Sequence, residues 1–137
     1  MNFLLKHREI ALAGIIALMV AGIGAYAPAF VSPANIVRVL NDTSILAMLA
    51  LAQMMVILTR GIDLSTASTL ALSGMISASL AQNHPDLPVL AFIALAIGTG
   101  LILGLINGSL ISFLGIPPIV VTLGTLAVFR GMIVVYG

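Results

Sequence analysis

Long uncharged apolar runs alternate with short polar segments along most of the chain. The first run covers residues 10–27, and others follow at about 44–59, 66–82, 89–113 and 119–136. At about 1.5 Å per helical residue the first run is roughly 27 Å long, close to the hydrocarbon thickness of a bilayer. The pattern therefore predicts an all-α fold, a polytopic transmembrane helix bundle with about five spans.

The segment between the first two runs has a different pattern. Prolines interrupt residues 26–33, Ser32 is a typical helix N-cap, and Pro33 suits the first turn of a helix. Apolar positions then alternate with polar ones, including Arg38 and Asp42. We expect a short interfacial helix here that leads into the second span.

Composition strengthens this interpretation. Of the 137 residues, 61% are hydrophobic and 7% are charged, whereas soluble domains carry about 25% charged residues. A soluble domain is therefore excluded, the lipid bilayer is the expected surrounding, and residues 1–137 are interpreted as a single transmembrane domain. The net charge of +1 gives no reason to expect a nucleic-acid partner.

The first run has a second interpretation, as a signal peptide. Residues 25–27 (Ala-Tyr-Ala) have the small-x-small form of a cleavage site. The run is longer than the usual apolar core of about 7–15 residues, and the rest of the chain is also membrane-like, which favours a span.

Basic residues predict the orientation. A cytoplasmic N-terminus places Lys6, Arg8 and Arg60 on the inside, whereas the other side receives Arg38 and Arg130. Cytoplasmic loops of membrane proteins carry an excess of Lys and Arg. We therefore expect the N-terminus in the cytoplasm.

Small residues recur every four positions in two of the predicted spans. Ser73 and Ser77 belong to such a series in the third span, and Gly100, Gly104 and Gly108 to one in the fourth. Small residues at this spacing allow another helix backbone to approach closely. The series predict helix packing, either as a static seam or as a flexible interface for transport.

Several polar residues lie within or between the spans. Gln53 and Asn107 are single polar residues in apolar helices, typical of interhelical contacts and also suited to ligand contact. Arg130 in mid-bilayer costs about 2.5–3.5 kcal/mol, so it either extends to the outer interface or has a pore-lining or ion-paired role. Residues 60–65 form either an exposed turn or a broken helix beside a solute path, and Asp63 and Ser65 there are helix-capping types.

Signals of catalysis and metal binding are absent from the sequence. The two histidines, His7 and His84, have no metal-ligand spacing, and there is no Cys. Lys6 is the single lysine, so the Gly-Lys-Ser/Thr of a phosphate-binding loop is missing. We expect no metal, no cofactor, no catalytic residue and no ATP hydrolysis by this chain itself.

Four stretches in this order look like a known family. They are residues 59–65 (TRGIDLS), 104–108 (GLING), 115–125 (GIPPIVVTLGT) and 130–131 (RG). The chain resembles the permease subunit of bacterial ribose-type (monosaccharide) ABC importers, in the branched-chain permease superfamily. Ala67 departs from the Gly usual in that family. Family members are about twice as long, so the resemblance implies an N-terminal half.

The resemblance implies a function and its partners. A monosaccharide, or a related small polyol or furanosyl solute, would pass along a path in the bacterial inner membrane. The partners would be a second permease copy or paralogue, separate cytoplasmic ATPase subunits and a periplasmic sugar-binding protein. Candidate residues for translocation or binding are Gln53, Asp63, Ser65, Asn107, Thr122, Thr125 and Arg130.

Two other classes of function stay open from the residues themselves. The first is a small stand-alone channel or ion-coupled carrier, for which a carboxylate buried within a span is expected. Asp42, Asp63 and Asp86 all fall at the ends of predicted spans, which counts against ion coupling. The second is a membrane assembly protein that only binds a partner.

Overall fold

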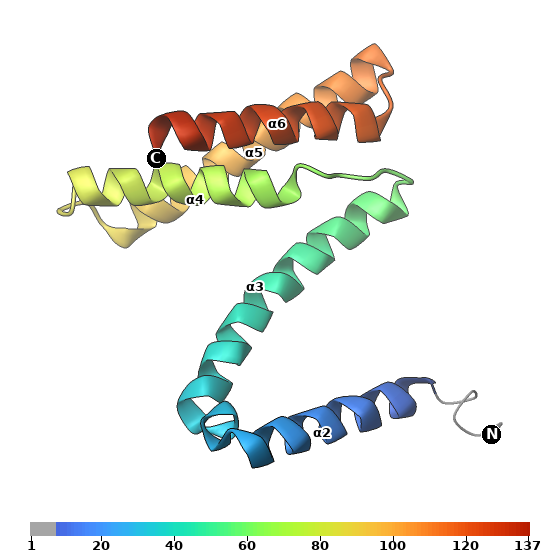
Figure 1. The fold of residues 1–137 in the computed structure, drawn as a ribbon. Coiled ribbons are helices and arrows are strands. Elements are labelled where there is room, and N and C mark those ends of the chain that lie inside the picture. Colours follow the sequence, from blue (N-terminus) through green and yellow to red (C-terminus); the bar gives the residue numbers. More distant parts are fainter. Residues whose placement is uncertain (1–7) are drawn as a thin grey trace. The chain divides into compact units, whose positions relative to one another are not determined.

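The structure is a computed structural model that describes residues 8–137, so Lys6 and His7 lie outside it. All its regular elements are helical (Figure 1). They are α2 (Arg8–Tyr26), the 3-10 helix η1 (Pro28–Val31), α3 (Pro33–Leu58), α4 (Thr66–Asn83), α5 (Val89–Leu114) and α6 (Pro118–Tyr136). The predicted all-α fold is confirmed.

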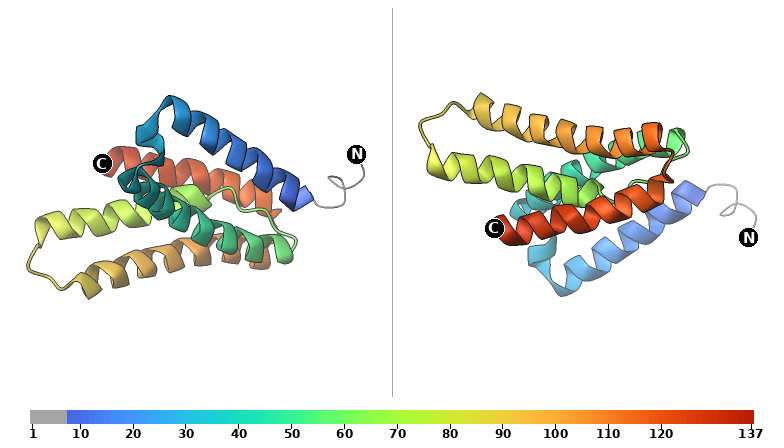
Figure 2. Two further views of the ribbon diagram at one scale, coloured as in Figure 1. Left: turned by 90° about the horizontal axis from the view of Figure 1, so that it is seen from below. Right: turned by 90° about the horizontal axis from the view of Figure 1, so that it is seen from above.

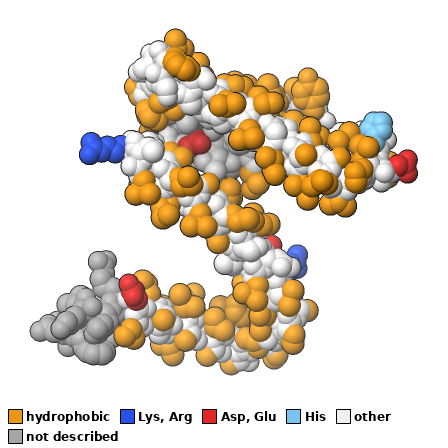
Figure 3. Space-filling model, turned by 180° about the vertical axis from the view of Figure 1, so that it is seen from behind, with side chains coloured by type: hydrophobic (Ala, Val, Ile, Leu, Met, Phe, Trp, Pro, Cys, Tyr) orange, Lys and Arg blue, Asp and Glu red, His pale blue; other side chains and the backbone are white. Residues whose placement is uncertain are grey.

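Four of these helices are long and apolar enough to cross a membrane, namely α2 from Glu9 onward, α3, α5 and α6. The fifth, α4, has the length of 18 residues but is rich in Ser and Thr. Hydrophobic side chains cover much of the surface (Figure 3), as expected where lipid surrounds the helices. The chain is a multi-pass membrane protein, and the predicted span at α4 is the most polar of its helices.

The structure corrects the predicted boundary between an interfacial helix and the second span. Residues 33–58 form one continuous helix of 26 residues, so no separate interfacial helix is present. No Pro or Gly interrupts residues 34–58, and the hydroxyl of Ser44 donates to the carbonyl of Asn41 at 2.7 Å. Polar residues alone do not end a helix. At about 39 Å, α3 is longer than the roughly 30 Å thickness of the hydrocarbon layer. Its polar first turns account for the extra length.

The start of α3 agrees with the prediction. The backbone N–H of Asn35 donates to Oγ of Ser32 at 3.4 Å, which makes Ser32 the N-cap. The Asn35 side chain donates to the carbonyl of Phe30 at 2.7 Å and ties η1 to α3. Gly24 of α2 faces η1 closely, because an added Cβ would lie 2.9 Å from Cγ1 of Val31.

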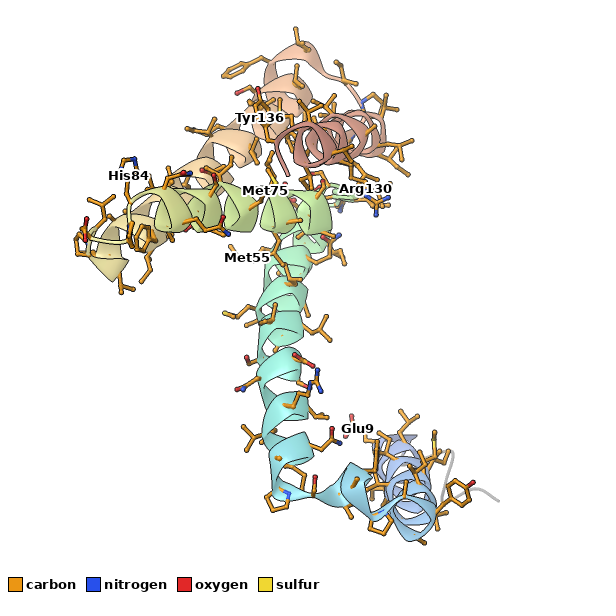
Figure 4. The ribbon with its side chains drawn as sticks, turned by 60° about the vertical axis from the view of Figure 1, so that its left-hand side comes forward. Glu9, Met55, Met75, His84, Arg130 and Tyr136 are labelled. Atoms are coloured by element: carbon orange, nitrogen blue, oxygen red, sulfur yellow. The ribbon has the colours of Figure 1, made fainter. Side chains whose placement is uncertain are left out.

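The described part of the chain divides into two compact units, one up to Met48 and one from Leu49 onward. The first holds α2, η1 and the beginning of α3, and the second holds the end of α3 with α4, α5 and α6. Within the second unit α4 lies beside α5 and α6 (Figures 1 and 2). Its core consists of Leu72, Leu103 and Phe129. Met75, labelled in Figure 4, packs against this core with Ile76 and Ile133.

The predicted packing residues have two different environments. Ser77 joins α4 to α5, because its hydroxyl donates to the carbonyl of Phe92 at 2.9 Å. Ser73 is buried, and its hydroxyl donates to Leu70 of its own helix at 3.0 Å. In contrast, a Cβ added at Gly100, Gly104 or Gly108 would meet no atom within 4 Å. This face of α5 lines an open groove of about 630 Å³, so its role in packing stays a prediction.

Candidate functional site

The site begins where α3 ends. The N–H of Arg60 donates to the carbonyl of Ile57 at 2.9 Å, and that of Gly61 donates to Val56 at 3.0 Å. This pair of bonds is the Schellman motif, which normally has Gly at its left-handed position. Here Arg60 occupies that position with φ of 59°. The chain thus leaves α3 through a sharp, strained turn into the linker, which we define as residues 61–65.

The linker is folded around the carboxylate of Asp63. Its Oδ1 accepts hydrogen bonds from the backbone N–H of Ser65 at 2.7 Å and from the Ser65 hydroxyl at 2.6 Å. Ser65 is completely buried. It precedes the first residue of α4, but its hydroxyl makes no capping bond to that helix. The two capping-type residues therefore bond to each other.

A third polar residue connects this linker to α5. The side-chain nitrogen of Asn107 donates to Oγ of Ser65 at 2.8 Å, across 42 positions of sequence. The carboxylate of Asp63 accepts the hydroxyl hydrogen of Ser65, so Asn107 must be the donor to that hydroxyl. This assignment leaves Oδ1 of Asn107 buried without a partner among the described residues.

Thr122 of α6 holds the other side of the linker. It is 2% exposed, and its hydroxyl lies 2.8 Å from the carbonyl of Pro118 and 3.2 Å from that of Ile62. Thr125 is also buried, but its hydroxyl stays within α6, 3.2 Å from the carbonyl of Val121. Of these two candidates, Thr122 reaches the linker.

The remaining two candidates lie apart from this group. The side-chain oxygen of Gln53 in α3 accepts from the hydroxyl of Thr66 at 3.1 Å, which links α3 to the start of α4. Arg130 is exposed on α6 and lies outside the core (Figure 4). The structure thus brings together Asp63, Ser65, Asn107 and Thr122, and leaves Arg130 separate.

Asp63, Asn107 and Thr122 border a cavity of about 580 Å³ within the second unit. Its polar side chains come from the turn after α3, the linker, α5 and α6; they are Thr59, Asp63, Asn107, Ser112 and Thr122. Val56, Ile62, Ile111 and Pro118 contribute apolar surface. Sequence reasoning missed Thr59, although its position directly before the helix break is a usable signal. In residues 8–137 no His or acidic side chains gather as a metal site would require.

Helices of membrane-spanning length surround a cavity in which a few polar groups converge. This arrangement defines a membrane protein with a candidate solute site. The chain belongs to the family described as branched-chain amino acid transport system / permease component, which matches residues 35–137. The family resemblance read from the four motifs is thereby confirmed.

Curated relatives are permeases by name. The chain is 38% identical to the D-allose transport system permease protein AlsC of Escherichia coli (strain K12), over 88% of this chain and 37% of the relative. It is 38% identical to the autoinducer 2 import system permease protein LsrC of Enterobacter sp. (strain 638), over 99% of this chain and 39% of the relative. The chain spans less than two fifths of the length of these relatives. No solved structure matches it significantly.

Proposed function

We propose that the chain forms part of the permease subunit of an ATP-driven importer for a monosaccharide or a related small polyol or furanosyl solute. Family membership and relatives named for D-allose and autoinducer 2 transport support this proposal. The observation that carries it is the cavity beside Asp63 and Asn107, a largely apolar recess in which a few polar side chains converge.

The proposal includes partners and location. A separate ATPase subunit would hydrolyse ATP, because the sequence offers no phosphate-binding loop. A second permease copy or paralogue and a periplasmic sugar-binding protein would complete the importer. We place the importer in the bacterial inner membrane, with residues 1–137 as one transmembrane domain. The basic residues favour a cytoplasmic N-terminus.

Within this permease, Asp63, Asn107 and Thr122 would border the solute path, and the buried Ser65 would hold Asp63 and Asn107 in place. An intramembrane polar group that is held by several helices is typical of a transport path. Gln53 would support the neighbouring helices, since its hydrogen bond joins α3 to α4. Thr125 would support α6, since its hydrogen bond stays within that helix. Arg130 would act elsewhere on α6, at the membrane surface or against another helix.

Deletion of the gene in its host tests the proposal. Uptake of radiolabelled D-allose, D-ribose, L-rhamnose and autoinducer 2 is measured with and without the gene restored in trans. We expect uptake of one of these solutes to fall to background and to recover on complementation.

A control separates an importer from the two competing classes. Depletion of cellular ATP should stop the same uptake, whereas a stand-alone channel would continue to equilibrate the solute. Normal uptake of all four solutes in the deletion strain would count against the proposal and favour an assembly role.

A further inference from the structure

The helix α6 has two faces of different character. One face is buried and contacts α4 and α5; its residues are Val121, Thr122, Thr125 and Phe129. The other face is exposed, and its residues are spaced alternately three and four positions apart. We define this outer stripe as Val120, Leu123, Ala127, Arg130 and Val134. This spacing keeps the stripe on one side of the helix over about 21 Å, so a second helix can lie along it.

Arg130 has no counter-charge on its own helix. It is the one charged residue of α6, which contains no Asp or Glu. The residues one turn away on either side are apolar; they are Leu126, Ala127, Ile133 and Val134. Arg130 also does not border the cavity beside Asp63. An arginine within a membrane span is costly and normally faces an opposite charge, backbone carbonyls or water. The compensating group for Arg130 must therefore come from outside α6.

The direction of α6 works against compensation by the nearer membrane surface. Arg130 lies six residues before Tyr136, about 9 Å, and twelve residues after Pro118, about 18 Å. The Cα–Cβ bonds of an α-helix tilt toward its N-terminus. The side chain of Arg130 therefore starts toward the distant end of α6 and away from the nearer one. An arginine that faces lipid here must bend back to reach the headgroups, whereas one that faces an adjacent helix need not.

We propose that the outer stripe docks a further membrane-spanning helix of the same permease, and that this helix carries an Asp or Glu that pairs with Arg130 within the bilayer. This inference rests on the proposed function. The chain spans 37% and 39% of the two relatives described above, so most of a permease of that length lies outside residues 1–137. A carboxylate matches the charge of a guanidinium and its two-pronged geometry. A single polar residue in an apolar seam also fixes the register of the two helices.

Small residues beside Arg130 leave room for such a helix. A Cβ added at Gly124 or Gly131 would meet no atom within 4 Å, and Ala127 lies one turn before Arg130. Small side chains allow a neighbouring backbone to approach closely. Even the short side chain of an aspartate could then reach the guanidinium of Arg130.

The first test uses the sign of a change in thermal stability. The protein as its host makes it is purified into lipid nanodiscs, and wild type is compared with Arg130→Leu. Leucine is favoured over arginine in contact with lipid, so a lipid-facing Arg130 predicts a higher Tm for the variant. A paired Arg130 predicts a Tm lower by about 5 °C or more, because the partner carboxylate loses its counter-charge. An unchanged or higher Tm would overturn the proposal.

Arg38→Leu is the matched control. It removes the same charge from an exposed position of another membrane-length helix, α3, where Asn41 and Asp42 supply polar surroundings. We expect its Tm to stay within about 2 °C of wild type. An equal fall in both variants would indicate a general sensitivity to the loss of surface charge and refute a specific role of Arg130.

The second test locates the partner. Arg130→Glu is introduced into the gene in its host, and uptake of the solute identified by the deletion experiment is measured. We expect uptake to fall at least about tenfold, because two carboxylates would face each other. Mutations that restore uptake should replace an Asp or Glu by Lys or Arg in a membrane-spanning helix outside residues 1–137.

Other origins of the restoring mutations contradict the proposal. A mutation at Asp42 would assign the carboxylate to this chain or to a second copy, and one in a different gene would assign it to another subunit. A set of restoring mutations that never changes a carboxylate would exclude ion pairing. Each of these results would overturn the docking of a further helix of the same permease.

The two tests separate this inference from the proposed function. If no solute depends on the gene but Arg130→Leu lowers the Tm and Arg38→Leu does not, the importer assignment fails and the ion pair of Arg130 stands. If uptake depends on the gene but neither Arg130 variant changes uptake or Tm, the importer assignment stands and the docking proposal fails.

Discussion

Asp63 is the residue on which the linker depends most, and its removal gives a measurable prediction. Its Oδ1 receives two hydrogen bonds from Ser65, at 2.7 and 2.6 Å, and Ser65 is completely buried. Hydrogen bonds to a charged acceptor contribute about 1.5–3 kcal/mol each, and a buried donor left unpaired adds its own cost. The two bonds share one acceptor, so their contributions do not simply add. We expect Asp63→Ala to lower the free energy of local opening of the linker by about 3 kcal/mol, which raises the opening equilibrium constant roughly a hundredfold.

Asp63→Asn separates hydrogen bonding from charge. An asparagine keeps an oxygen in the place of Oδ1, so it can still accept from Ser65, and we expect a cost of about 1 kcal/mol or less. Asp86→Ala is the matched control, since Asp86 is an exposed carboxylate in the turn between α4 and α5. Its removal should change the opening free energy by less than about 0.5 kcal/mol.

Hydrogen exchange of the Ser65 backbone amide reports this opening directly. The full chain in nanodiscs should show exchange about a hundredfold faster in Asp63→Ala, and near wild-type exchange in Asp63→Asn and Asp86→Ala. Solute uptake by cells should fall in the same order. Similar exchange in all four proteins would refute the reasoning, because the linker would then be held by contacts other than the Asp63 carboxylate.

Three further substitutions test other parts of the structure. Arg60→Gly should raise the free energy of unfolding by about 1 kcal/mol, measured by denaturant titration, because the left-handed conformation is costly for a residue with a Cβ. Thr122→Val should lower it by about 1 kcal/mol, since the linker carbonyl of Ile62 loses its donor. Gly100→Ala should leave it unchanged or raise it by up to about 1 kcal/mol, because a Cβ there meets nothing within 4 Å; reduced uptake by this variant would indicate that the α5 face packs against another helix.

Helix boundaries marked by Pro, Gly or a capping-type residue were predictable, including the start of α4 at Thr66 directly after Ser65; the boundary predicted within α3 was wrong. Pro33 begins α3, and Gly115 with φ of 64° follows the last residue of α5. Polar residues near Asp42 suggested a boundary that the structure lacks, because hydrogen bonds within the helix satisfy the backbone whichever side chains it carries. The periodic signal thus describes which face is apolar and says little about where a helix ends.

The members of the site were predictable one by one, but not their contacts. Asp63, Ser65 and Asn107 stood out as polar residues in or beside apolar segments. Their connection spans 42 positions and depends on how α5 packs beside α4. The left-handed conformation of Arg60 was not predictable from the sequence either. Glycine normally occupies the left-handed position after a helix, so Gly61 would have been expected to adopt it.

The linker also explains why a non-helical segment persists in a bundle of apolar helices. Irregular backbone is tolerated at membrane depth only where it is buried in protein or lines a water-filled cavity. Asn107 lies seven residues before the end of α5, about 10 Å along the helix. The linker is fastened at that depth by three contacts: the Schellman turn from α3, the Ser65 hydroxyl bonded to Asn107, and the Ile62 carbonyl beside Thr122. Among the described residues, Oδ1 of Asn107 is the one buried side-chain nitrogen or oxygen without a hydrogen-bond partner. The linker is therefore held in place from α3, α5 and α6, while its residues Gly61, Ile62 and Asp63 border the cavity.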